Sequence, residues 1–164
     1  MDGFKLLQER RSVRRFKSKE VSFSILFSII NAARFAPTAR NIQPCEFITI
    51  TDRPSLEKCG ELTAPNGSFI SGAAAAIVII SKDTKYYLED GSAATTYCLL
   101  AAFELGLGSC WVAGDKKDYA QKILEYLKVP AGYKLISIVA LGFADEVPSL
   151  AKKMASEVLH VERF

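Results

Sequence analysis

The chain has 164 residues, of which 49% are hydrophobic and 24% are charged, and its formal net charge is +3. This length is typical of one domain with a sizeable core, and the composition excludes an intrinsically disordered chain. A net charge of +3 is too small for the dense basic surface of a dedicated nucleic-acid-binding protein. We therefore expect a single globular domain over residues 1–164 that acts on small molecules and not on nucleic acid.

The sequence begins with MDGFKLLQERR, which lacks the apolar core of a secretory signal peptide. The longest apolar stretch, residues 72–80, is too short to cross a bilayer, so we expect a cytoplasmic protein without a membrane segment. Four cysteines without CxxC spacing and a single histidine do not form a zinc-site pattern. No metal site is predicted, and the thiols are expected to be buried and reduced.

Hydrophobic periodicity predicts two helices in the first third of the chain. Residues 4–9 form a short helix, and a second helix begins near Ser22 or Ser24 and ends at Pro37. Residues 45–51 alternate in polarity and are rich in β-branched side chains, which predicts a strand.

The rest of the chain alternates helices and strands. After one more helix come a buried strand at 73–81 and a helix of small residues at 90–105, ended by a glycine. A short strand at 109–114, a helix with a solvated charged face at 116–127 and a buried strand at 134–143 follow. The last residues form an extended C-terminal tail. This order predicts an α+β fold in which helices flank a small central sheet.

The segment RRSVRR at residues 10–15 raises the question of what compensates so many neighbouring positive charges. Forked guanidinium donors beside a hydroxyl suit a phosphate group. The alternatives are a solvated basic turn and arginines paired with surface carboxylates.

The loop APTARNIQP at residues 36–44 offers hydroxyl and amide groups at the rim of an apolar core, through Thr38, Asn41 and Gln43. A planar heterocycle with a polar edge needs such partners. Plain turn chemistry is an equal alternative, with Pro44 forcing Gln43 into an extended conformation.

The segment ELGLGSCWVAGD at residues 104–115 carries glycines that follow a helix, so it does not match a dinucleotide-binding fingerprint. Here the glycines allow the backbone to approach a ligand or a neighbouring chain closely, although a tight core would also explain them.

In order along the chain, five stretches resemble the FMN-dependent nitroreductase family: LLQERRSVRRF, NAARFAPTARNIQPCEFITI, DGSAATTYCLLAAFELGLGSCWVAG, VPAGYKLISIVALGFADE, and the basic KK before EVLHVERF. The resemblance covers nearly the whole chain. It implies a nitroreductase-like α+β fold with a mostly antiparallel sheet, and a homodimer that holds FMN at its interface with parts from both chains. One departure is Cys45, which stands where the family usually has Trp.

The resemblance also implies which residues of this chain hold the cofactor, and it requires no catalytic side chain because the flavin carries the chemistry. The implied contacts are Arg10, Ser12 and Arg14, with adjacent Arg11, at the phosphate and ribityl chain; Pro37, Thr38, Ala39 and Asn41, with supporting Gln43, along the flavin and ribityl chain; Asn66 at the pyrimidine edge; the backbone N–H groups of Ala113 and Gly114 near flavin N5; and Lys152 and Lys153 at the phosphate.

The implied activity is ping-pong hydride transfer from NADH or NADPH to FMN and on to a small acceptor such as a nitroaromatic or a quinone. Two alternatives remain open from the sequence. One is a flavin-binding or storage protein without efficient nicotinamide turnover, which the shortness of the chain motivates. The other is a small module that binds nucleic acid or another anionic partner through RRSVRR, which the low net charge and the lack of interleaved aromatic residues disfavour.

Overall fold

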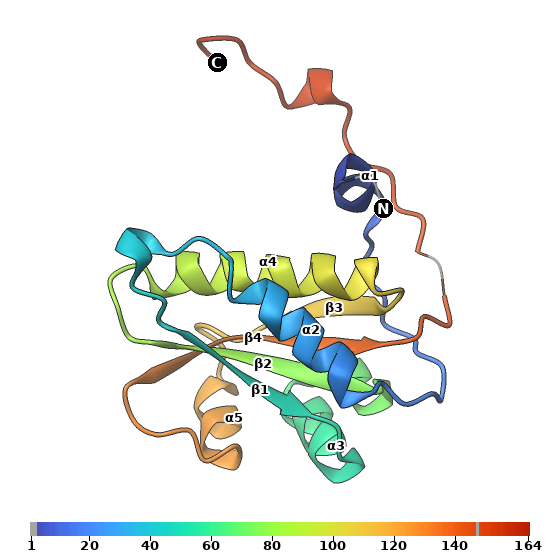
Figure 1. The fold of residues 1–164 in the computed structure, drawn as a ribbon, viewed down its shortest axis with the longest axis vertical. Coiled ribbons are helices and arrows are strands. Elements are labelled where there is room, and N and C mark those ends of the chain that lie inside the picture. The colour runs from blue at the N-terminus through green and yellow to red at the C-terminus, as the bar shows by residue number, and fades with distance from the viewer. Residues whose placement is uncertain (1–2, 147) are drawn as a thin grey trace.

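Four antiparallel strands form a central sheet with helices on both of its faces, in a computed structural model that describes residues 3–146 and 148–164 (Figure 1). The strand order is β1-β2-β4-β3, and every neighbouring pair is antiparallel. The predicted α+β fold with helices flanking a small sheet is therefore confirmed. The strands are β1 (Cys45–Ile50), β2 (Ala75–Lys82), β3 (Gly108–Ala113) and β4 (Tyr133–Gly142).

Two helices cover each face of the sheet, while α1 lies apart from it (Figure 1). Helices α2 and α4 pack on one face, and α3 and α5 pack on the other. The helices are α1 (Gly3–Glu9), α2 (Phe23–Ala33), α3 (Arg53–Leu62), α4 (Tyr87–Glu104) and α5 (Ala120–Tyr126), and the short 3-10 turns are η1 (Ala39–Asn41), η2 (Ser68–Gly72) and η3 (Ala155–Glu157).

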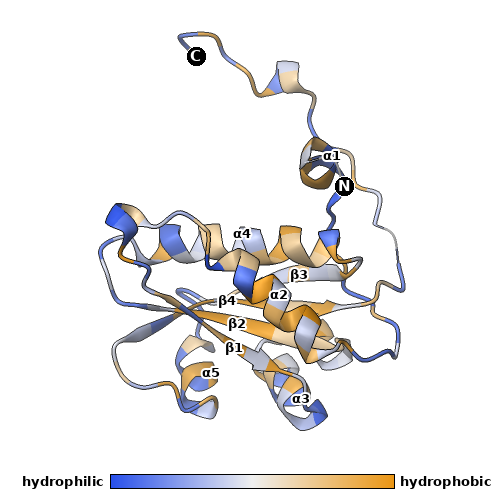
Figure 2. Ribbon diagram, viewed as in Figure 1, coloured by the Kyte–Doolittle hydropathy of each residue, from blue (hydrophilic) through white to orange (hydrophobic). Residues whose placement is uncertain are grey.

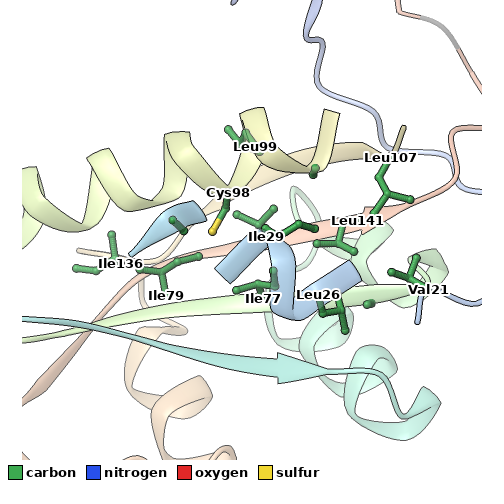
Figure 3. Packing of buried hydrophobic residues seen from close by; sticks show 14 residues of the cluster. Val21, Leu26, Ile29, Ile77, Ile79, Cys98, Leu99, Leu107, Ile136 and Leu141 are labelled. Carbon is green, nitrogen blue, oxygen red and sulfur yellow. The ribbon is translucent and has the colours of Figure 1, made fainter. Parts of the chain in front are cut away.

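The central strand β2 is buried on both faces, and its side chains alternate between two hydrophobic clusters. Ile77 and Ile79 point into the cluster under α2 and α4, together with Ile136 of β4 (Figure 3). Val78 and Ile80 point into the opposite cluster under α3 and α5. This explains why the sequence of the strand is a continuous apolar run rather than an alternating one, and Figure 2 shows it as one of the most hydrophobic parts of the ribbon.

The end of α4 follows the sequence prediction closely. Gly106 has φ of +79°, its N–H donates to the carbonyl of Phe103, and the Leu107 N–H donates to the carbonyl of Ala102 at 2.8 Å. These two bonds satisfy carbonyl groups left open by the last turn of the helix, in the arrangement known as the Schellman motif.

Three helix boundaries differ from the predictions. The second helix ends at Ala33, before Pro37, and α4 begins at Tyr87, earlier than predicted. The helix predicted from residue 116 begins only at Ala120, because Lys116 has φ of +58°, which an α-helix does not accommodate.

The predicted C-terminal tail is confirmed. After β4 the chain leaves the body of the molecule, and residues 149–164 are all exposed (Figure 1). Within the described ranges, none of the helices is both long and apolar enough to span a bilayer.

Candidate functional site

The basic segment between α1 and α2 runs along the outer edge of β3. Ser12 forms an isolated parallel bridge with Ser109, and the Val13 N–H donates to the Ser109 carbonyl at 2.9 Å. Val13 is buried against Gly108, where an added Cβ would lie 2.8 Å from the valine side chain. Val13 therefore holds the segment RRSVRR against β3.

Two of the four arginines are already engaged within the chain. The Arg11 guanidinium donates to the carbonyl of Gln8 at 2.6 Å and to that of Arg10 at 3.0 Å. Arg15 forms an ion pair with Glu146, with 3.4 Å between Nε and Oε2. Both guanidinium groups have partners that compete with a ligand.

Glu146 also holds the backbone of the basic segment. Its Oε1 accepts from the N–H groups of Arg14 at 2.8 Å and Arg15 at 3.3 Å. The Arg14 backbone N–H is the main reason that the pKa of the Glu146 carboxyl lies below its ordinary value. A carboxylate more than a hundred residues away thus fixes the course of this segment.

The other two arginines and the serine all act on the thiol of Cys110 in β3. Within the described part of the chain, neither Arg10 nor Arg14 forms an ion pair. Burial raises the pKa of the Cys110 thiol, and the charge of Arg14, a hydrogen bond with Ser12 and the charge of Arg10 act to lower it. Guanidinium groups that form no ion pair in the described residues, beside a hydroxyl, have the donor set that binds a phosphate.

Next to this thiol lies a cavity of about 380 Å³ that brings together three of the predicted residues, Arg14, Asn66 and Ala113. Lys117 and Tyr119 also line it. The Arg14 guanidinium lies 5.8 Å from the ring centre of Phe69, which lines the cavity too. The volume lies within the range of small-molecule sites, about 300–1,000 Å³.

The N–H groups of Ala113 and Gly114, both predicted to donate to the flavin, point in opposite directions. The Gly114 N–H donates to the Ile136 carbonyl of β4 at 2.9 Å, so it is not available to a ligand in this structure. Donors alternate between the two sides of an antiparallel strand, which turns the Ala113 N–H toward the open edge. On that edge the Tyr119 hydroxyl already donates to the Ala113 carbonyl. Ala113 therefore offers a free donor, and Gly114 offers none.

The loop before β1 has an unusual backbone. Arg40, Asn41 and Gln43 have φ of +54°, +55° and +53°, so the expectation that Pro44 makes Gln43 extended is wrong. The Thr38 hydroxyl accepts from the Gln43 N–H at 3.1 Å, and the Gln43 amide lies 3.2 Å from the Asn41 side-chain oxygen. These bonds compensate the strain of the left-handed residues by closing the loop on itself.

The loop lines a cavity of its own. Thr38 and Gln43 lie beside Cys45 and Phe47 around a space of about 130 Å³, and no residue lines both this space and the cavity at Arg14. Pro37 is exposed, and Ala39 is half-buried. The predicted flavin residues are therefore together in one loop, but not with the predicted phosphate residues.

The two groups lie near opposite ends of α4 (Figure 1). Ala39 is hydrogen-bonded to Asp90 near the start of the helix, and Arg11 shares a cavity with Gly106 just beyond its end. The stretch of helix from Asp90 to Glu104 is about 21 Å long at 1.5 Å per residue. Lys152 and Lys153 lie in the exposed tail and line neither cavity.

Sequence reasoning missed several residues of the site. Lys117 was interpreted as part of a solvated helical face, but it precedes the helix and lines the cavity. Glu146 lies within the matched stretch that ends in ADE, where no local pattern links it to the arginines. Tyr119 and Asp90 likewise act through contacts that only the fold creates.

Comparison with known proteins decides the family. A sequence model described as the Nitroreductase family matches residues 7–79 and 61–143. The chain belongs to the nitroreductase family. A relative from Archaeoglobus fulgidus, provisionally named an NADH dehydrogenase/NAD(P)H nitroreductase, is 37% identical over 146 residues, which cover 85% of this chain and 83% of the relative.

Solved structures of this family have the same fold. An FMN-dependent nitroreductase from Clostridium difficile superposes with a TM-score of 0.92 at 34% identity, covering 98% of this chain and 99% of the other. A provisionally named nitroreductase from Desulfovibrio desulfuricans, solved in complex with FMN, superposes at 0.88 with 27% identity, covering 100% and 98%. The nitroreductase-like fold expected from the sequence is confirmed.

Proposed function

We propose that this nitroreductase-family oxidoreductase binds FMN and transfers electrons from NADH or NADPH to a small acceptor such as a nitroaromatic or a quinone. The observation that carries the proposal is the cavity lined by Arg14, Asn66 and Ala113, beside the edge of β3 along which Ser12 lies. FMN, when bound, supplies the redox chemistry by accepting hydride from the nicotinamide and reducing the acceptor.

The residues of this chain then have separate tasks. Arg10, Arg14 and the Ser12 hydroxyl would bind the phosphate, and Asn66 would pair with the polar edge of the ring. The Ala113 N–H donates to the flavin near N5. Lys117, which lines the same cavity, would stabilise negative charge on the ring, whereas Nη1 of Arg11 already donates to two backbone carbonyls.

The site is completed by a second copy of the chain. Within one chain the loop at residues 36–44 lies near the opposite end of α4 from the basic segment, so a homodimer has to bring the loop of one protomer to the phosphate residues of its partner. An apolar groove of about 400 Å³ over α4, lined by Leu6, Tyr97 and Leu105 among others, offers surface for such a contact. The tail carries Lys152 and Lys153 outward, toward the phosphate of the partner's site.

The proposal is tested by charge reversal at the phosphate. We expect the purified wild-type protein to retain the visible flavin spectrum after addition of FMN and desalting. Arg14→Glu removes a charge-assisted bond worth about 1.5–3 kcal/mol and adds repulsion, so it should lose the flavin. Lys122→Glu makes the same charge change at an exposed position on α5 and should retain it. An Arg14→Glu protein with full flavin would overturn the phosphate assignment.

Turnover distinguishes the enzyme from a flavin carrier. A protein that holds FMN should oxidise NADH or NADPH in the presence of a quinone or nitroaromatic acceptor. Retention of FMN without steady-state oxidation of either nicotinamide would instead identify a flavin-storage protein.

A further inference from the structure

The loop at residues 36–44 adopts a conformation that its own sequence does not favour. Arg40, Asn41 and Gln43 all have positive φ, and none of them is glycine. Backbone strain of this kind costs about 1–3 kcal/mol per residue and persists only where the surrounding structure imposes it. Hydrogen bonds within the loop hold part of this conformation, and a contact from outside the loop adds to them.

The contact that the structure shows is a carboxylate on α4. Asp90 is 5% exposed, and its Oδ1 accepts from the Ala39 N–H at 2.8 Å. Its Oδ2 is buried and has no hydrogen-bond partner in the described part of the chain. Burying a carboxylate with one oxygen unsatisfied is costly, and a purely structural position would more cheaply hold a neutral side chain.

The helix that carries Asp90 is a rigid support. Asp90 lies in the first turn of α4, where the helix dipole favours negative charge. The next residue, Gly91, packs so closely on β4 that an added Cβ would lie 2.6 Å from the Ile136 side chain. This close packing on β4 supports the helix where its carboxylate meets the loop.

We propose that Asp90 is a positioning residue for the flavin: through the Ala39 N–H it holds residues 38–43 in the strained conformation that faces the cofactor. This inference rests on the proposed function, because it assigns the loop to the FMN site. Asp90 itself need not touch the cofactor, since it acts through the backbone of Ala39.

The test combines a flavin-independent readout with a flavin-dependent one. Amide hydrogen exchange of the peptide that spans residues 36–44 reports the loop directly, and FMN titration reports its consequence. Asp90→Ala should speed exchange in this peptide and raise the FMN Kd about tenfold or more. Asp90→Asn keeps an oxygen that accepts from Ala39, so it should stay close to the wild type in both readouts. Glu89→Ala, on the exposed side of the same turn, should change neither.

A second variant removes the donor and leaves the carboxylate in place. Ala39→Pro suits the backbone, because Thr38 before it is extended, with φ of −129° and ψ of 147°, as a residue preceding proline must be. If Asp90 acts through the Ala39 N–H, combining Ala39→Pro with Asp90→Ala should weaken FMN binding no more than the worse single change does. Additive losses would overturn the proposal.

The remaining outcomes are also decisive. An Asp90→Ala protein with a mobile loop and unchanged FMN affinity would overturn the positioning role. Failure of Asp90→Asn to restore binding would show that charge acts rather than the hydrogen bond, and would overturn it as well. If the wild type binds no FMN, the proposed function fails. Hydrogen exchange of residues 36–44 in the wild type and Asp90→Ala still measures whether Asp90 stabilises the loop.

Discussion

A buried pair of hydroxyl groups joins α4 to the strand beneath the candidate site, and its hydrogen bonds predict an asymmetric response to mutation. Thr95 and Ser137 are both fully buried, and their side-chain oxygens lie 2.7 Å apart. The Thr95 hydroxyl also donates to the Gly91 carbonyl at 2.7 Å. A hydroxyl has a single proton, so Ser137 must be the donor to Thr95.

The two single substitutions therefore differ in cost. Thr95→Val leaves the Ser137 hydroxyl buried without an acceptor, which costs about 1–3 kcal/mol of unfolding free energy. Ser137→Ala leaves Thr95 bonded to Gly91 and costs only about 0.5–1.5 kcal/mol, typical of one lost hydrogen bond. In the double variant no orphaned donor remains, so its destabilisation should be smaller than the sum of the two by about 1 kcal/mol.

The assay is urea-induced unfolding of the flavin-free protein at one fixed protein concentration, because association shifts apparent stability. Thr96→Val is the matched control, since Thr96 is exposed on the same helix and should shift stability by no more than about 0.5 kcal/mol. A larger cost for Ser137→Ala than for Thr95→Val, or strict additivity, would refute the assigned direction of the bond.

Two further predictions follow from titratable groups. The pKa of Glu146 is lowered in the folded chain, chiefly by the Arg14 backbone N–H, so its contribution to stability is complete above its ordinary value of 4.5 and disappears as the pH falls through the lowered value. Urea midpoints of the wild type and Glu146→Gln should therefore differ at pH 7 and converge in acid; a constant difference would contradict this. Burial raises the pKa of Cys45 and Cys59 to about 11. At neutral pH iodoacetamide should alkylate both thiols about a hundredfold more slowly in the native than in the urea-unfolded protein, and equal rates would show that they are not shielded.

The four arginines of RRSVRR, whose neighbouring positive charges need compensation, have different partners in the structure. Glu146 forms an ion pair with Arg15, and the Arg11 guanidinium donates to two backbone carbonyls. Arg10 and Arg14 form no ion pair in the described residues. The sequence could pose these alternatives but could not assign them. Charge type is local information, whereas the identity of a partner depends on the fold.

The buried strands were predictable because a strand that is buried on both faces has a continuous run of apolar residues. The apolar run before Ser81 became β2, and Gly106 ended α4 as a left-handed glycine must. The left-handed backbone at Asn41 could not be predicted, because the loop meets residues far away in the sequence, such as Asp90, 51 positions from Ala39. No periodicity or turn pattern records such a contact.

The site itself was predictable only through resemblance, and only as a set of residues. The structure brings Arg14, Asn66 and Ala113 to one cavity, and it places the loop at residues 36–44 elsewhere. The separation of these two groups within one chain follows from the fold, and no local pattern in the sequence reveals it.

The most direct test of the account is anaerobic addition of NADH or NADPH to the FMN-loaded protein, followed by its visible absorbance. The account predicts that one equivalent of nicotinamide removes the flavin absorbance and that a quinone or nitroaromatic acceptor then restores it. An Arg14→Glu protein, unable to retain FMN, should show no such cycle. A wild-type protein that holds no FMN, or holds it and is never bleached by either nicotinamide, would contradict the proposed function.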